Sequence, residues 1–235
     1  MNLLLLQDTD FIADDRVRIT DRRLQHLNTV NKACVGQTLR AGRLGGLQGQ
    51  ATLLSIDSHC AELQVNLQDP APAKLPLTLI LALPRPKMLR RTLQTIASMG
   101  VNKLVLINSY RVEKSFWQTP FLQPEALHEQ LLLGLEQARD TVLPNIILAK
   151  RFKPFVEDEL PAMAANTRGL IAHPGDFPEC PRALSESVTL AIGPEGGWIP
   201  YEVELLSKAG LSPVQLGERI LRVETAVPAL LARLF

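Results

Sequence analysis

Two segments near the end of the chain, 193-GPEGGW-198 and 216-LGERILRVETA-226, carry most of the information about the fold. The first segment follows a short apolar run at 188–192, and the second begins at the end of a short predicted strand at 214–216. Apolar runs of this length that end at a glycine-containing turn predict buried strands. Because ligands of open α/β sheets bind beyond the carboxyl ends of strands, we expect both segments to face a ligand.

The first segment is a glycine-rich turn whose function its composition leaves open. Gly193, Gly196 and Gly197 allow the main chain to approach a ligand closely, and Pro194 stiffens the turn. Such a loop suits a flat nucleoside, although a lone glycine-rich loop is more often an ordinary strand-to-helix turn. No Gly-Lys-Ser/Thr follows, and the glycine spacing is not that of a dinucleotide-binding loop, so phosphate binding is disfavoured.

The second segment concentrates charged residues where a final apolar helix should begin, namely Glu218, Arg219, Arg222 and Glu224, followed by Thr225. Glu224 and Thr225 are residue types that cap a helix N-terminus. The two arginines are either functional or surface partners of the glutamates, and residue types alone leave both interpretations open.

Upstream of these segments the chain alternates strands with helices. Apolar runs predict strands at 77–83, 103–108, 145–148 and 169–172, and apolar residues at helical spacing predict helices at 88–99, 124–139, 200–209 and up to 235. This alternation indicates an α/β domain with a parallel sheet covered on both faces.

The first part of the chain has a different pattern. Strands are predicted at 3–6, 16–19, 37–41, 49–56 and 61–67, with one helix at 21–32. This pattern predicts a small β-barrel. The segment 68-QDPAPAKLP-76 favours a stiff, extended connector, so we expect domains at 1–70 and 71–235.

The composition is that of an ordinary globular protein, with 46% hydrophobic and 21% charged residues. The three cysteines lack metal-ligand spacing, and no apolar run approaches the roughly 18 residues of a spanning helix. We therefore expect a cytoplasmic protein without a metal. The net charge of +1 hides a basic cluster in residues 85–114, which is either a phosphate-binding surface or a solvated helix face.

Taken together, in this order and at this spacing, the two opening segments resemble the signature of the 16S ribosomal RNA uracil-N3 methyltransferase family of the SPOUT superfamily. His173-Pro174, Arg111 and Glu136-Gln137 with Pro144 add to the resemblance. The chain departs from the family at 95-TIASMGV-101, where the family has Lys-Ala-Thr-Glu-Leu-Gly-Val. Two further departures are Val30-Asn31-Lys32 in place of Val-Leu-Arg, and Arg139, which stands one place early.

The resemblance implies a deep trefoil knot in the C-terminal α/β domain, a PUA-like N-terminal barrel that helps to hold RNA, and a homodimer. It also implies S-adenosyl-L-methionine as cofactor and 16S ribosomal RNA of the small subunit as substrate. Two alternatives are an inactive RNA- or ribosome-binding protein on the same fold and a small-molecule enzyme that uses a nucleotide.

The same resemblance assigns roles to residues of this chain. Arg222 is expected to neutralise charge on the uracil or a phosphate, and Glu224 either orients Arg222 or caps the helix. The cofactor-binding residues are expected to be His173, Pro174, Ile192, Gly193, Pro194, Glu195, Gly196, Gly197, Leu216, Gly217, Ile220, Leu221, Thr225 and Ala226. The RNA-binding residues are expected to be Arg22, Arg23, Lys32, Arg85, Lys87, Arg90, Arg91 and Arg111.

Overall fold

The computed structural model describes residues 2–235 of the chain. The chain forms two compact units, one of Met1–Ala73 with Leu132–Leu143 and the other of Lys74–Leu131 with Pro144–Phe235. The first break, at Ala73, lies close to the connector at 68–76. The segment Leu132–Leu143 joins the first unit, although it falls within the range 71–235 of the expected second domain.

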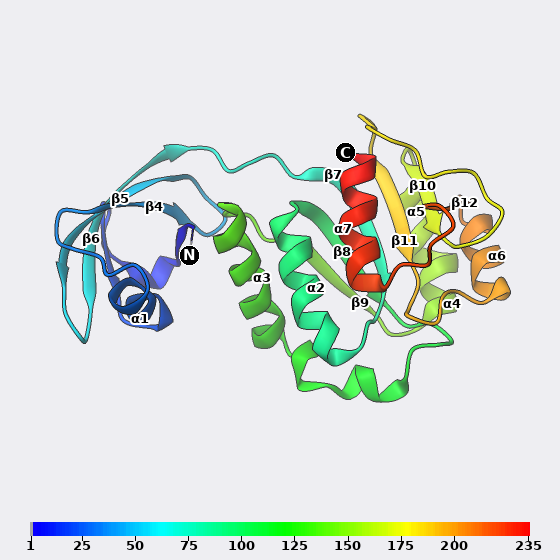
Figure 1. Cartoon of the computed structure of the whole chain (residues 1–235), viewed down its shortest axis with the longest axis horizontal. Coiled ribbons are helices and arrows are strands. Elements are labelled where there is room, and N and C mark those ends of the chain that lie inside the picture. The colour runs from blue at the N-terminus through cyan, green and yellow to red at the C-terminus, as the bar shows by residue number, and fades with distance from the viewer. Residues whose placement is uncertain (1) are drawn as a thin grey trace. The chain divides into compact units, whose positions relative to one another are not determined.

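The first unit is built on a six-stranded sheet with the order β1-β4-β5-β6-β3-β2. Figure 1 labels β4, β5 and β6 of this sheet. Its strands are β1 (Leu4–Leu6), β2 (Phe11–Ala13), β3 (Arg16–Ile19), β4 (Thr38–Arg43), β5 (Gln48–Ile56) and β6 (Ala61–Asp69). Strand β1 runs parallel to β4, and the other neighbours are antiparallel. Alternate residues such as Val17, Leu53 and Leu63 form the buried core of this unit.

Helix α1 (Arg22–Thr29) packs Leu24 and Leu27 into the same core. Asp21 caps the helix, because its side chain accepts a hydrogen bond from the main-chain N–H of Arg23 at 2.9 Å. The helix ends before the predicted boundary at residue 32. Lys32 has a φ of 46°, a left-handed conformation that cannot continue a right-handed helix.

The second unit contains a six-stranded sheet with the order β12-β10-β11-β7-β8-β9, and all of its strand pairs are parallel. The strands are β7 (Leu75–Ala82), β8 (Val101–Ile107), β9 (Asn145–Ala149), β10 (Arg168–Ala172), β11 (Val188–Ile192) and β12 (Ser212–Val214). Their apolar residues are almost wholly buried, as in Leu79, Val105 and Leu190. The predicted parallel sheet is therefore confirmed.

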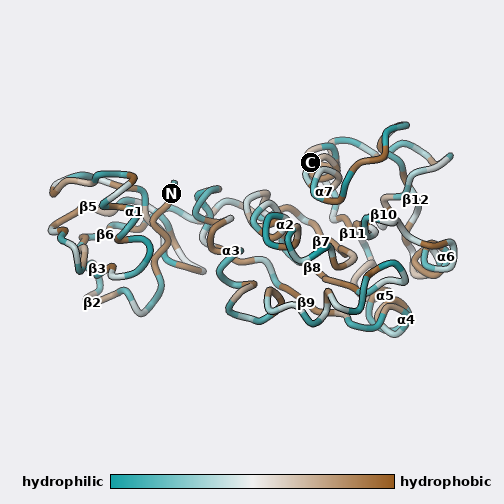
Figure 2. The backbone as a smooth tube through the Cα atoms, turned by 60° about the horizontal axis from the view of Figure 1, so that its bottom comes forward, coloured by the Kyte–Doolittle hydropathy of each residue, from teal (hydrophilic) through white to brown (hydrophobic). Residues whose placement is uncertain are grey.

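Helices cover both faces of this sheet. They are α2 (Pro86–Ser98), α4 (Phe152–Pro154), α5 (Leu160–Ala164), α6 (Pro200–Lys208) and α7 (Val223–Leu234). Helix α3 (Pro124–Ala138) begins in this unit, and its residues from Leu132 onward belong to the first. Figure 1 shows α2 and α7 in front of the sheet and α4 and α5 behind it. Figure 2 shows the same layers from another side, with hydrophobic stretches in the strands between them.

The structure differs from the expected elements in three places. The segment 152–164 forms α4, a π-helical turn η4 (Phe155–Glu159) and α5, and Pro154 and Pro161 break the continuous period that would have predicted it. The short 3-10 helices η1 (Asp8–Asp10), η2 (Lys114–Gln118) and η3 (Pro120–Leu122) were also not predicted. Strand β12 ends at Val214 and does not reach Leu216, so the residues that follow are free to line a site.

Candidate cofactor pocket

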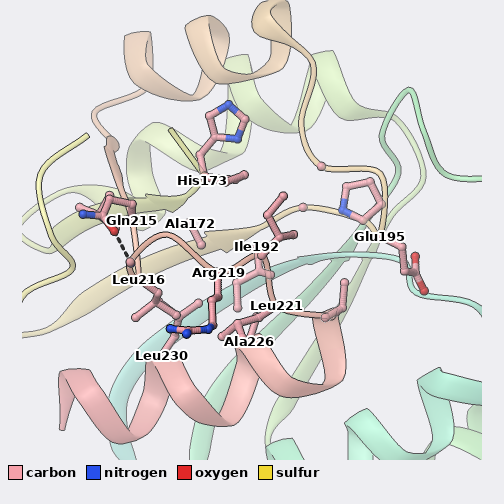
Figure 3. Close-up of a pocket in the computed structure, with 18 of the residues that line it drawn as sticks. Ala172, His173, Ile192, Glu195, Gln215, Leu216, Arg219, Leu221, Ala226 and Leu230 are labelled. Carbon is pink, nitrogen blue, oxygen red and sulfur yellow. Dashed lines mark hydrogen bonds between the residues drawn. The ribbon is translucent and has the colours of Figure 1, made fainter. Parts of the chain in front are cut away.

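A pocket of about 250 Å³ opens at the carboxyl ends of β10, β11 and β12, which are neighbours in the sheet (Figure 3). Three loops and one helix line it: the loop after β10, the loop after β11, the loop after β12, and one face of α7 as far as Leu230. This is the edge where parallel α/β sheets bind ligands, because the loops diverge there and main-chain groups become accessible.

Most of the predicted cofactor-binding residues line this one pocket. They are His173, Pro174, Ile192, Gly193, Pro194, Glu195, Gly196, Gly197, Leu216, Gly217, Ile220, Leu221 and Ala226. Thr225 is the exception. It is exposed, lies outside the lining, and uses its main-chain N–H to donate to the Arg222 carbonyl oxygen at 2.9 Å within the first turn of α7.

The loop after β11 folds back tightly on itself. The N–H of Gly197 donates to the Pro194 carbonyl at 2.7 Å, and the φ of Gly197 is +74°. A Cβ at Gly193 would lie 3.1 Å from the main-chain nitrogen of Trp198, so a side chain there would push against the buried indole. The glycines thus serve the close packing of the loop and leave its main chain facing the pocket.

Two further contacts attach this loop to neighbouring elements of the same unit. Glu195 Oε1 accepts a hydrogen bond at 3.2 Å from the main-chain N–H of Arg85, the residue that precedes α2. Arg111, in the loop after β8, donates from Nη1 to the carbonyl oxygen of Gly196. In Figure 3, Glu195 lies at one side of the site, away from Leu216 and Leu230.

The loop after β12 is irregular up to the start of α7. Gly217 has a φ of +105°, and its N–H donates to the side-chain oxygen of Gln215 (Figure 3). The helix then places Val223, Ala226 and Leu230 on the pocket side. These positions follow i, i+3 and i+7 spacing, which is one face of a helix.

His173 brings a buried polar atom to the pocket. Its Nδ1 is buried and has no hydrogen-bond partner within residues 2–235, and its ring lies 5.6 Å from that of Phe177. Burial lowers the pKa of His173 below its ordinary value, because the charged imidazolium is poorly solvated there. A neutral imidazole with a vacant nitrogen is suited to a polar ligand group that needs one hydrogen-bond partner.

The lining combines apolar surface with main-chain groups and little charge. Glu195 and Arg219 are the charged side chains of the lining, and both are exposed. Ile192, Leu216 and Leu221 offer apolar faces to a flat ring. In the part of the chain that the structure describes, no group of three or more His, Cys, Asp or Glu side chains is placed to hold a metal ion.

The two predicted catalytic residues stand beside this lining. Arg222 is the exposed residue that precedes α7, and its carbonyl oxygen accepts the N–H of Ala226 at 2.7 Å. Glu224 lies in the first turn of α7, where a carboxylate interacts favourably with the helix dipole. Among the described residues no ion pair joins Arg222 to Glu224, and no side-chain hydrogen bond caps α7, so the two expected roles of Glu224 remain alternatives.

The predicted RNA-binding residues of the first unit differ in accessibility. Arg23 is only 4% exposed, and its guanidinium donates to Asp10, Asp21 and the Leu5 carbonyl. It is therefore not available to a phosphate, and its expected RNA contact is corrected to a structural role. Arg22 makes a two-bond pair with Glu136, at 2.6 and 3.0 Å, and Lys32 is exposed.

The predicted RNA-binding residues of the second unit are all exposed, and most belong to α2. Lys87, Arg90 and Arg91 lie in its first half, and Arg85 directly precedes it. The guanidinium of Arg90 lies over the Phe121 ring, 5.3 Å from its centroid, which is a cation–π distance. Arg111 differs from these residues, because its side chain donates a hydrogen bond to the Gly196 carbonyl in the loop after β11.

Sequence reasoning missed part of the lining, namely Ala172, Val214, Gln215, Arg219, Val223 and Leu230. Ala172, Val214 and Gln215 stand at or directly after strand ends, so extending each loop by one or two residues would have found them. Val223 and Leu230 share a helix face with Ala226, which the helical period of the final segment already indicated.

None of the helices in residues 2–235 combines the length and the apolar character needed to cross a bilayer.

The chain is similar to proteins that modify ribosomal RNA. It is 29% identical over 235 residues to the ribosomal RNA small subunit methyltransferase E of Treponema pallidum, covering 97% of this chain and 88% of the relative. It is 23% identical to the ribosomal RNA small subunit methyltransferase E 1 of Borreliella burgdorferi, covering 97% of this chain and 95% of the relative.

Its fold matches that of a solved relative. The crystal structure of a ribosomal RNA small subunit methyltransferase E from Neisseria gonorrhoeae, bound to S-adenosyl methionine, superposes with a TM-score of 0.79 and 24% identity. The match covers 99% of this chain and 95% of that one.

A family model described as RNA methyltransferase domain matches residues 71–235, which include every strand of the parallel sheet and all of the pocket lining. The chain therefore belongs to the RNA methyltransferase domain family, in agreement with the resemblance carried by its two C-terminal segments.

Proposed function

We propose that this protein transfers the methyl group of S-adenosyl-L-methionine to N3 of a uridine in the 16S ribosomal RNA of the small subunit. The observation that carries the proposal is the single pocket at the ends of β10, β11 and β12, which gathers most residues of both signature segments. The relatives named for small-subunit RNA methylation support the substrate, and the solved relative bound to S-adenosyl methionine supports the cofactor.

The pocket fits a nucleoside better than a phosphate. Ile192, Leu216 and Leu221 present apolar faces, and the glycine-containing loops expose main-chain donors and acceptors without covering them by side chains. When bound, S-adenosyl-L-methionine supplies an electrophilic methyl group on a positively charged sulfonium. The neutral His173 adds no positive charge to the pocket lining, which would favour binding of a positively charged cofactor.

Arg222 is the proposed charge-stabilising residue. Methylation of N3 releases the N3 proton to solvent and leaves S-adenosyl-L-homocysteine. The uracil develops negative charge as the proton departs, and an exposed guanidinium at the edge of the pocket can donate to the uracil or to a neighbouring phosphate. Glu224 is proposed to act at the N-terminus of α7, where its carboxylate helps to hold the first turn that carries Arg222.

The exposed residues Arg85, Lys87, Arg90 and Arg91 are proposed to contact RNA phosphates. In the first unit, Arg22 and Lys32 are proposed to make weaker contacts, and the unit itself is proposed to be a PUA-like barrel that helps to hold the RNA. These roles divide RNA holding between the N-terminal domain and the start of α2, and assign catalysis to the domain from residue 71 onward.

The remaining expectations concern topology and assembly. We propose a trefoil knot in which the chain after β12 is threaded through an earlier loop. It is supported by Gln215, which pairs with Pro178 and Cys180, and by Arg233 and Leu234, whose carbonyls accept from Ala183 and Leu184. We also propose a cytoplasmic homodimer, which sedimentation analysis tests directly.

The function is tested by incubating the purified protein with small ribosomal subunits that lack the modification and with radiolabelled S-adenosyl-L-methionine. Nuclease digestion and mass spectrometry should then find a labelled nucleoside that coelutes with N3-methyluridine. Label in another nucleoside would overturn the uridine assignment. Calorimetry on the free protein distinguishes an inactive RNA binder, which would not bind S-adenosyl-L-methionine.

A further inference from the structure

The loop after β8 presents an aromatic side chain to solvent. Tyr110 is 80% exposed, a high value for a large ring that would ordinarily gain stability from burial. Within residues 2–235 its hydroxyl makes no hydrogen bond and its ring makes no aromatic or cation contact. Packing of the fold therefore does not explain the presence of an aromatic residue here.

The main chain that carries this ring is nevertheless held firmly. Glu202, on α6, is only 2% exposed, and its Oε1 accepts the N–H of Tyr110 at 2.8 Å. The other oxygen of Glu202 accepts the N–H of Ile199 at 3.0 Å. Burying a carboxylate is unfavourable unless charge-assisted hydrogen bonds of this kind offset the desolvation. Glu202 therefore holds the main chain of this loop in place through its hydrogen bond to the Tyr110 N–H.

The residues around Tyr110 strengthen the attachment. The indole N–H of Trp117 donates to Asn108 Oδ1 at 2.9 Å, and the N–H of Val112 donates to the Ser109 carbonyl at 3.1 Å. Because the backbone of this loop is already fixed, only the side-chain torsions of Tyr110 remain to be ordered when a flat partner stacks on its ring.

The position of the loop ties this ring to the cofactor pocket. Arg111, the next residue, donates to the carbonyl of Gly196, which belongs to the pocket lining. A Cβ at Gly196 would lie 2.9 Å from Arg111 Cδ, which shows how closely the two loops pack. The main chain that carries Tyr110 therefore lies next to the loop that borders the pocket.

We propose that Tyr110 is a stacking platform for an unpaired nucleobase of the RNA substrate, beside the cofactor pocket. The inference rests on the proposed function and adds a base-binding subsite to it. Aromatic side chains bind single-stranded RNA in this way because every base has a flat face, and such stacking does not depend on phosphate charge.

The test compares Tyr110→Ala with Tyr110→Phe in the methylation assay with small ribosomal subunits. Tyr110→Ala should raise the KM for RNA about 5- to 150-fold, the range that corresponds to removing one stacked base. Tyr110→Phe keeps the ring and should stay near wild type. The calorimetric Kd for S-adenosyl-L-methionine should be unchanged in both variants.

Tyr201→Ala is the matched control, because Tyr201 is an aromatic residue of α6 that is 49% exposed and lies outside the pocket lining. It should leave the KM for RNA unchanged. A Tyr110→Ala enzyme with the wild-type KM would overturn the proposal. So would a change of oligomeric state in sedimentation, which would assign Tyr110 to a contact between subunits.

A direct titration separates this inference from the proposed function. A fluorescent oligouridylate should bind the wild-type protein more tightly than an abasic oligomer of equal length, and Tyr110→Ala should abolish that difference. The slope of log K against log salt should not change, because no phosphate contact is lost. If the wild-type protein fails to methylate RNA, the proposed function fails, while this titration still decides the role of Tyr110.

Discussion

The carboxylate of Glu195 accepts a hydrogen bond from the main-chain N–H of Arg85, at 3.2 Å, so a loop that follows β11 caps the start of α2. Helix α2 has no side-chain cap of its own, and Pro86 occupies its first turn. The first N–H groups of a helix lack internal partners and carry partial positive charge. Glu195 therefore joins the pocket lining to the helix whose exposed residues are proposed to meet RNA.

Replacing Glu195 should weaken this cap. We expect Glu195→Ala to lower the free energy of unfolding by about 1 kcal/mol, as for other lost N-terminal caps. Glu195→Gln should cost less, because its amide oxygen can still accept the Arg85 N–H. Urea unfolding of the three proteins measures the difference. Glu186→Ala, at an exposed loop position, is the control, and an equal loss there would refute the capping role.

Arg111 and Gly196 should act as one unit in cofactor binding. Arg111→Ala removes the donor to the Gly196 carbonyl and should raise the calorimetric Kd for S-adenosyl-L-methionine about 5- to 10-fold, as for loss of an exposed charge-assisted bond. Gly196→Ala should act by displacing the Arg111 side chain, whose Cδ would lie 2.9 Å from the new Cβ.

The double variant decides whether the two changes share this mechanism. In the double variant Arg111→Ala has removed the Arg111 Cδ that the new methyl group at position 196 would clash with. The double variant should therefore bind the cofactor about as well as Arg111→Ala alone. If the Kd increase of the double variant equals the product of the two single-variant increases, Gly196 is needed for a different reason, such as direct contact with the cofactor.

Arg23 should matter for folding and little for RNA. Its removal leaves Asp10, which is 8% exposed, without its two-bond partner. Breaking a buried pair in this way typically costs about 3–5 kcal/mol. We expect Arg23→Ala to lower strongly the urea concentration at which the first unit is half unfolded. Arg18→Ala, which removes the exposed pair with Glu62, should change this midpoint far less. Equal midpoints for the two variants would contradict the structural role.

Acid should weaken cofactor binding through His173. Because burial lowers the pKa of His173, the folded protein keeps the imidazole neutral at a pH where the unfolded chain is already protonated. The free energy of unfolding therefore keeps its full contribution from His173 above the ordinary histidine pKa of about 6.5. This contribution declines as the pH falls below that value. The protonated ring would then repel the sulfonium of the cofactor.

Calorimetry with S-adenosyl-L-methionine between pH 7.5 and 5 checks this expectation. The Kd of the wild-type protein should rise toward acid, and the Kd of His173→Gln should stay nearly constant over the same interval. An identical rise in both proteins would assign the effect to another group.

Local sequence patterns predicted much of the framework. The apolar run Val188–Ile192 forms β11 with its predicted bounds, and Gly100 and Gly210, with φ of +73° and +101°, follow the ends of α2 and α6 as expected. Such features depend on neighbouring residues, whose spacing the sequence states directly. The same patterns did not predict the short helices at 152–164, because two prolines interrupt their period.

The sequence by itself therefore determined the α/β alternation and the loops that surround the pocket, since burial and turn formation follow from local composition. Only the tertiary structure decided which charged residues stay available for function. Arg22 and Arg23 are adjacent in the chain, yet Arg23 is buried against Asp10 and Arg22 pairs with Glu136, at a sequence separation of 114. Likewise, Glu195 caps α2 and Arg111 holds Gly196 because the fold brings distant segments together, and charge pairing depends on distance in space.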